Sequence, residues 1–173
     1  MIAAIHFSQK KQGLANAKTY LFSAIFILGN LILPQICHLI PNGGLIFLPI
    51  FFFTLIAGYK YGLITGLMTA VLSPIVNFLL FGMPAEPMLP IILAKSILLA
   101  VAAAMIAQRT GKLSIVTLAL VVLAYQLPGM LIEWVSTNSF YMASQDVRLG
   151  IPGILLQIIG GFFLLKWLDK HGN

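Results

Sequence analysis

The stretch Met88–Ala107, MLPIILAKSILLAVAAAMIA, decides the fold class of this chain. A helix needs about 20 apolar residues to cross a bilayer, and this stretch supplies them. Lys95 is its one charged residue. A charge at such a depth costs at least roughly 2.5 kcal/mol, so it faces a partner or a watery cavity instead of lipid. The stretch therefore predicts a membrane helix that carries a functional polar group.

The composition of the whole chain points the same way. Of its 173 residues, 60% are hydrophobic and 8% charged, and the mean hydropathy is +1.02. A soluble domain of this length cannot bury so much apolar surface. We therefore predict one integral membrane domain over residues 1–173, of the all-α class. The single cysteine, Cys37, excludes an intrachain disulfide.

Six apolar runs are candidate transmembrane passes. The second run is short and contains Pro49, so it is predicted to be tilted, kinked or partly re-entrant, with its irregular backbone covered by protein or water. Turn residues separate the runs, and no linker is long enough for a second domain. The predicted spans are about 18–40, 45–58, 61–81, 88–107, 113–133 and 149–168.

The basic residues predict the orientation of the six spans. Lys and Arg are enriched in cytoplasmic loops. With the N-terminus inside, eight of the ten basic residues fall on the cytoplasmic side, and an even number of spans returns the C-terminus there. These residues are scattered at span ends instead of forming one basic face, which argues against nucleic-acid binding. The eight are Lys10, Lys11, Lys18, Lys60, Arg109, Lys112, Lys166 and Lys170.

Polar residues recur at one depth, in the outer half of the predicted bundle. At about 1.5 Å per residue, Lys95 lies about 10 Å below the outer surface. Since buried polar groups in lipid need partners, the layer predicts an outward-facing cavity with substrate-binding residues. These candidates are Lys95, Glu133, Gln126, Asn77, Trp134, Asn42, Gln157 and Asn138.

Each candidate also has a structural interpretation. Trp134 fits an ordinary interfacial aromatic belt. Gln157 fits hydrogen bonding between helices. Lys95 and Glu133 fit a pair that neutralises itself across the fourth and fifth spans. The acidic residues Glu86 and Asp146 are expected to be solvated loop charges.

Small residues predict close helix contacts. Gly62, Gly66 and Ala70 share one face of the third span, which allows another backbone to approach. Ala15, Thr19 and Ser23 make a weaker stripe at the start of the first span. Both stripes are candidates for docking a partner protein, and packing within the monomer is the alternative for the first.

Motifs for enzyme chemistry are missing. The sequence has no phosphate-binding Gly-Lys loop, no His-Glu-x-x-His motif and no Gly-x-Ser-x-Gly elbow. His, Cys and carboxylates lack metal-ligand spacing. Ser96 beside Lys95 is a weak candidate for a dyad, because adjacent helical side chains point about 100° apart. We predict no catalytic residues, no metal site and no cofactor.

Two segments carry a resemblance to a known family. They are Asn42–Pro49, NGGLIFLP, and Ala57–Gly66, AGYKYGLITG. Over nearly its whole length the chain resembles the S-component, the substrate-binding membrane subunit of energy-coupling factor (ECF) vitamin transporters. Such subunits often combine a glycine-rich outer loop, an apolar helix with proline, and a Gly-x-x-x-Gly turn into helix three.

The resemblance implies a transport function in a prokaryotic plasma membrane. An S-component captures a small water-soluble vitamin or precursor from outside, under the loop that here spans residues 40–45. It then docks on a transmembrane coupling subunit with two cytoplasmic ATPases and topples to release its substrate inward. Lys95, Gln126, Glu133, Trp134 and Gln157 lie on the helices that the family uses for binding. The family's Ala-x-x-x-Ala docking motif is replaced by Ala15, Thr19 and Ser23.

Two alternatives remain open at the level of sequence. One is a membrane assembly or scaffold subunit, in which the polar layer only ties helices together. The other is a small solitary carrier. Solitary carriers usually have paired halves or broken helices in both halves, which this sequence lacks.

Overall fold

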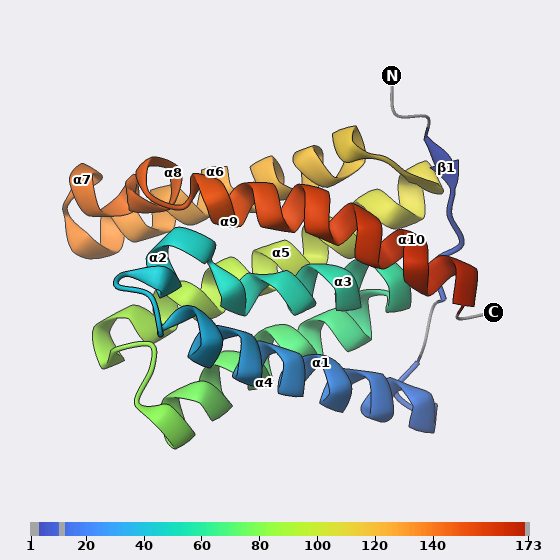
Figure 1. Cartoon of the computed structure of the whole chain (residues 1–173), viewed down its shortest axis with the longest axis horizontal. Helices are drawn as coiled ribbons and strands as arrows, with labels where there is room; N and C mark the ends of the chain where they lie inside the picture. Colours follow the sequence, from blue (N-terminus) through green and yellow to red (C-terminus); the bar gives the residue numbers. More distant parts are fainter. Residues whose placement is uncertain (1–3, 11–12, 172–173) are drawn as a thin grey trace.

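A computed structural model describes residues 4–10 and 13–171 as a bundle of helices that run along one long axis (Figure 1). Among these residues, five helical segments are long and apolar enough to cross a membrane. The chain is therefore a helical membrane protein, as predicted. The five segments are α1 (Ala17–Cys37), α4 (Leu63–Phe81), α5 (Leu89–Thr110) with the preceding turn η2 (Glu86–Met88), α6 (Ile115–Thr137) and the continuous rod 151–171.

The second predicted span is broken into three pieces. These are α2 (Gly43–Phe47), η1 (Pro49–Phe51) and α3 (Phe52–Tyr61). Leu48 lies between α2 and η1 with a left-handed φ of 46°, and Pro49 follows it. At about 1.5 Å per residue, α3 is roughly 15 Å long and too short to cross a bilayer alone. This segment matches the kinked interpretation of the run, not a regular helix.

The short helix α3 forms the centre of the bundle. It packs against α1, α4, α5 and α10 (Gly161–His171). Leu55, Ile56 and Ala57 are completely buried. Because protein surrounds α3, its irregular start is shielded from lipid, as a broken helix in a membrane requires.

Asn30 of α1 satisfies the polar groups near the start of α3. Its Oδ1 accepts the Phe53 backbone N–H at 3.2 Å. Its Nδ2 donates to Thr54 Oγ1 at 3.0 Å and to Ser73 Oγ at 3.2 Å. The first N–H groups of a helix have no partner within it, so this side chain acts as a cap supplied by a neighbouring helix. Asn30 thus links α1, α3 and α4 by hydrogen bonds.

The small-residue stripe lies inside the monomer. A β-carbon on Gly66 would lie 2.8 Å from Gly58 Cα, and one on Gly58 would lie 2.9 Å from the Ala100 carbonyl oxygen. These contacts bring α3, α4 and α5 together without side chains between them. Gly62, with φ of 88°, makes the turn between α3 and α4. Ala70 is also completely buried.

These positions favour packing within the monomer, the alternative given for the first stripe, over docking of a partner. Gly62, Gly66 and Ala70 are buried by the chain itself, so a partner protein cannot reach them in this structure. In α1, Thr19 donates to the Gly13 carbonyl at 2.7 Å and Ser23 contacts Met68 Sδ at 3.7 Å. Both are buried, and only Ala15 of the six predicted docking residues is exposed.

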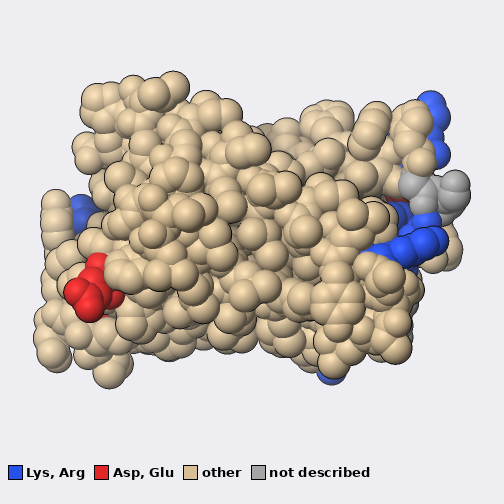
Figure 2. All heavy atoms as spheres, turned by 90° about the horizontal axis from the view of Figure 1, so that it is seen from below, with Lys and Arg blue, Asp and Glu red and all other residues tan. Residues whose placement is uncertain are grey.

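One end of the bundle, here called the β1 end, gathers the basic residues. β1 (Ile5–His6) pairs antiparallel with β2 (Lys112–Leu113) there. Gln9 Nε2 lies within 3.3 Å of the carbonyl oxygens of Gly58, Tyr59 and Ala104. Figure 2 shows most of the visible Lys and Arg atoms at this end and acidic atoms at the opposite one. Lys11 lies outside the described residues.

Lys60, in the last turn of α3 at the β1 end, is buried. Its Nζ forms an ion pair with Asp169 of α10 and lies 4.6 Å from the centre of the Phe7 ring. The pair ties the end of α3 to the last helix.

The opposite end, here called the α2 end, carries short irregular elements. Besides α2 and η2, it holds α7 (Phe140–Ala143) and α8 (Gln145–Arg148), which connect α6 to the final rod (Figure 1). That rod consists of α9 (Ile151–Leu155), the π-helical turn η3 (Leu156–Gly160) and α10. The polar residues of interest surround this end.

Candidate functional site

A buried cluster of three charged residues lies at the α2 end. Lys95 Nζ of α5 contacts Glu133 Oε2 of α6 and lies 2.8 Å from Asp146 Oδ2 of α8. Gln145 Nε2 donates to the other Glu133 oxygen at 3.2 Å. The Lys95 and Glu133 side chains are 3% and 0% exposed. A Lys95–Glu133 pair, one of the two interpretations of these residues from the sequence, is thus present, in a larger cluster.

Asp146 corrects the sequence-based interpretation. The sequence favours a solvated loop charge, but the residue is 6% exposed and bonded to Lys95. The reason is that the chain after α6 does not extend away from the bundle. Instead, α7 and α8 fold back over it, and α8 places Asp146 and Gln145 on the Lys95–Glu133 pair.

Glycines make room for this arrangement. Gly129 of α6 faces the Lys95 side chain, and a β-carbon there would lie 2.8 Å from Lys95 Cγ. Gly153 of α9 lies against the Phe47 backbone, where a β-carbon would approach its carbonyl oxygen to 2.5 Å. The first glycine seats the lysine, and the second brings α9 against α2.

A small cavity adjoins the ion cluster beneath α2. Its volume is about 70 Å³. Lys95, Glu133, Gln145 and Asp146 form its polar wall. Its other walls are apolar side chains and one glycine backbone, from Gly44, Leu45, Leu48, Ile50, Phe51, Met88, Ile91 and Ile92. We call this space the polar cavity.

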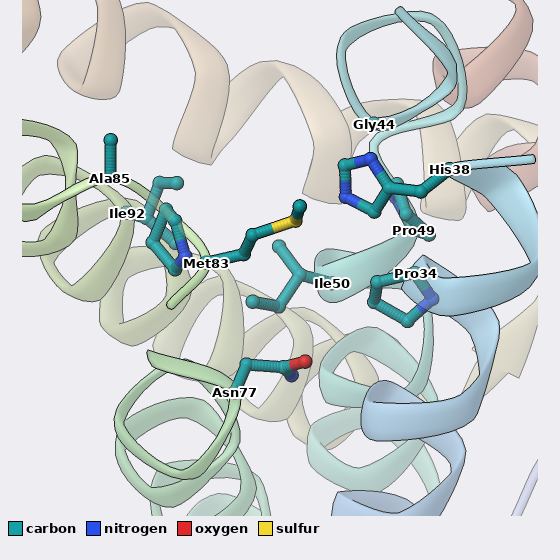
Figure 3. Close-up of a pocket in the computed structure, with 10 residues that line it drawn as sticks. Pro34, His38, Gly44, Pro49, Ile50, Asn77, Met83, Ala85 and Ile92 are labelled. Atoms are coloured by element: carbon teal, nitrogen blue, oxygen red, sulfur yellow. The ribbon is translucent and has the colours of Figure 1, made fainter. Parts of the chain in front are cut away.

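A second, larger cavity lies beside it and is drawn in Figure 3. It has a volume of about 210 Å³ and is largely apolar, so we call it the apolar cavity. Two residues bring polar atoms to it: His38 follows α1 and Asn77 comes from α4 (Figure 3). The remaining walls are Pro34, Gly44, Pro49, Ile50, Met83, Pro84, Ala85 and Ile92.

Asn77 has one unsatisfied polar atom at this cavity. Its Nδ2 donates to the carbonyl oxygens of Asn30 at 2.9 Å and Ser73 at 3.1 Å. Its Oδ1 is buried and has no hydrogen-bond partner among the described residues. In Figure 3 the amide oxygen lies below Ile50 and points toward the side of Pro34. A ligand with a hydrogen-bond donor would satisfy it.

The two cavities share some of their walls, namely Gly44, Ile50 and Ile92. Each is smaller than the roughly 300 Å³ at the lower limit of typical ligand pockets. A vitamin-sized molecule therefore requires both cavities, or a displacement of the elements that cover them. The loop before α2, residues 38–42, and α8 are those covering elements at this end.

Other predicted binding residues lie away from these cavities. Gln126 is buried and lines a different, apolar hollow beside Met130 and Ile154. Gln157, in the π-helical turn, accepts the Tyr125 hydroxyl at 3.0 Å, which supports its role between helices. Its Nε2 has no partner among the described residues.

The remaining three candidates lie on the surface of the α2 end. Trp134 is 46% exposed and contacts the Phe140 ring edge to face at 5.3 Å, as in an interfacial belt. Asn42 and Asn138 are exposed residues with left-handed backbone conformations that end or begin helices. None of the three lines the polar or the apolar cavity.

The site combines buried charged side chains with apolar walls. Within the described residues, no three His, Cys, Asp or Glu side chains are grouped so as to hold a metal ion. Ser96 Oγ is buried without a hydrogen-bond partner among those residues, so it does not form a dyad with Lys95. The sequence did hold a signal for Asp146. With four acidic residues in all, a buried lysine has few possible partners.

Comparisons with models of protein families, with curated proteins and with solved structures found no match to this chain.

Proposed function

We propose that this protein is the substrate-capture subunit of an ECF-type importer for a small water-soluble vitamin or cofactor precursor. One observation carries the proposal. A buried cluster of Lys95, Glu133 and Asp146 forms one wall of a cavity beneath α2. Charged groups inside a membrane protein are costly and usually mark a ligand path or binding site. Their position under the α2 loop agrees with the resemblance to S-components.

The distribution of charge supports an orientation. Most of the basic residues visible in Figure 2 lie at the β1 end, and this end is cytoplasmic under the rule that Lys and Arg are retained inside. The α2 end and both cavities then face outward. The segment 43–61 serves as the second of six passes, with α2 and η1 as its outer portion. Both termini are then cytoplasmic, in the plasma membrane of a prokaryote.

In the proposed mechanism, the substrate enters where the 38–42 loop, α2 and α8 cover the cavities. The substrate then replaces some of the contacts among Lys95, Glu133 and Asp146 with its own. The loop, α2 and α8 enclose it. Delivery into the cell then requires a transmembrane coupling subunit and two cytoplasmic ATPases. These partners follow from the resemblance, and the bilayer-facing helices provide the apolar surface on which such a subunit docks.

Ligand-dependent thermal stability tests the capture function. The purified protein in detergent is melted with each compound of a panel of vitamins and precursors. A ligand at 100 times its dissociation constant stabilises a folded protein by about 2.7 kcal/mol, which a melting curve resolves. A strong hit whose affinity changes in a Lys95→Ala protein that is still folded supports the site. Unchanged affinity in Lys95→Ala would remove Lys95 from it.

A second candidate function is a membrane assembly subunit. The observation in its favour is that Lys95, Glu133 and Asp146 bond to one another and thereby join α5, α6 and α8. This function predicts a folded protein that no compound stabilises. Co-purification of the chain with a pair of ATPases would instead favour the importer.

A further inference from the structure

We propose that the captured substrate is a small cation, with its positively charged or N–H-rich end at Asp146 and Glu133. This inference rests on the proposed capture function and specifies the chemical class of the substrate. Its basis is the formal charge of the polar cavity. One ammonium, Lys95, faces two carboxylates, so the wall carries one excess negative charge.

Other charged groups do not compensate this excess among the described residues that line the cavity. Arg148 is close in sequence, but its guanidinium is directed elsewhere. It donates to the Tyr141 carbonyl at 2.7 Å and to Ser144 Oγ at 3.1 Å, and it stacks 3.7 Å over the Tyr141 ring. His38 lines the apolar cavity and not the polar one.

The hydrogen-bonding capacity of the cluster also favours a cation. An ammonium has three N–H groups, and Lys95 already donates to both carboxylates. Only one N–H of Lys95 therefore remains for a ligand. A carboxylate ligand would have to compete with Glu133 and Asp146 for Lys95 while meeting their repulsion. An ammonium, amidine or charged ring nitrogen would add to the acceptors that remain on the two carboxylates.

Burial strengthens this preference. Like charges in a partly desolvated site repel far more than in water, because the effective dielectric constant is lower. A cation in the polar cavity neutralises the excess carboxylate, whereas an anion makes the local charge more negative. The apolar cavity beside it takes the uncharged end of the same molecule, and Asn77 Oδ1 offers that end a hydrogen-bond acceptor.

The experiment compares probes that share one ring and differ in charge. The intact protein is titrated with 1-methylnicotinamide, nicotinamide and nicotinate, and in parallel with thiamine, riboflavin, pantothenate and biotin. Binding is measured by thermal stabilisation and calorimetry. We expect a cationic compound to bind at least tenfold more tightly than any uncharged or anionic compound in the set.

Three variants locate the effect. Asp146→Asn keeps the shape of the side chain and leaves Lys95 paired with Glu133, so we expect it to fold and to weaken cation binding at least tenfold. Asp146→Glu should restore most of the affinity. Glu86→Gln removes the same charge from an exposed position at the same end and should change affinity less than twofold.

The outcomes separate this inference from the capture function. An anionic or uncharged compound as the tightest ligand overturns the cation assignment but supports capture. Cation binding that Asp146→Asn does not change also overturns the assignment. If a folded protein binds no compound of any charge, the capture function fails and the inference fails with it.

Discussion

Gly129 of α6 provides the space that the Lys95 side chain of α5 occupies. A β-carbon at residue 129 would lie 2.8 Å from Lys95 Cγ and 3.3 Å from Cε. These atoms belong to the stem of a side chain whose ammonium is held by two carboxylates, so the stem cannot move away freely. The glycine and the lysine therefore form one packing unit.

Gly129→Ala should disturb this unit. We expect the added methyl group to displace Lys95 from its carboxylates and to lower the free energy of unfolding by about 1–3 kcal/mol, as overpacking usually does. Thermal unfolding in detergent measures the change. Gly13→Ala is the matched control, because a β-carbon there meets nothing within 4 Å. Equal melting temperatures for the two variants would contradict this packing of Gly129 against Lys95.

Lys95→Met should be strongly destabilising. It leaves Glu133 and Asp146 buried beside each other without a cation, and loss of one partner of a buried ion pair costs about 3–5 kcal/mol. Asp146→Asn in the same chain should recover some of this loss. A double-mutant cycle of the two changes gives their coupling energy. Strictly additive effects would show that Lys95 and Asp146 do not interact.

Asn30→Ala should weaken the centre of the bundle. The change removes the cap on Phe53 and leaves the Thr54 and Ser73 hydroxyls without their shared partner. Each buried group that loses its hydrogen bond costs about 1–3 kcal/mol. The melting temperature should fall accordingly. Thr110→Ala, an exposed hydroxyl change in α5, provides the comparison and should melt like the parent protein.

Lys60→Met should separate stability from binding. Lys60 lies at the β1 end and pairs with Asp169, which is 26% exposed and so can be solvated when its partner is lost. We expect a loss of stability smaller than that of Lys95→Met. Ligand affinity should remain within about twofold of the parent, since neither cavity includes this pair. A large loss of affinity in Lys60→Met would contradict the assignment of the binding site to the α2 end.

The sequence predicted the class of the protein because long apolar runs have few alternatives. It also offered a Lys95–Glu133 pair as one interpretation, since a buried charge demands a partner, but it left open whether the pair or a ligand supplies that partner. It could not place Asp146, because the four-residue helix α8 is too short for its periodicity to reveal which side faces inward. In the sequence, a buried acidic residue in a polar loop looks the same as a solvent-exposed one.

The stripe of small residues shows a different limit. The spacing of Gly62, Gly66 and Ala70 correctly indicated a close helix contact. Spacing alone does not say whether the neighbour belongs to the same chain, and here it does, because Gly58 and Ala100 occupy the opposite side. Depth has the same limit as spacing. Gln126 was predicted at about the same membrane depth as Lys95, but it lines a different hollow.

The close backbone contacts among α3, α4 and α5 have a mechanical consequence. Gly58, Gly66 and Ala100 are in direct contact, so these helices cannot slide past one another without a steric clash. The three helices therefore behave as one rigid unit. Lys95 belongs to α5 of this unit, whereas Asp146 belongs to the short helix α8 outside it. The two sides of the ion cluster thus belong to a long helix inside the bundle and to a four-residue helix at its end. A ligand that binds Asp146 more strongly than Lys95 does would release α8 from Lys95, while α3, α4 and α5 keep their contacts.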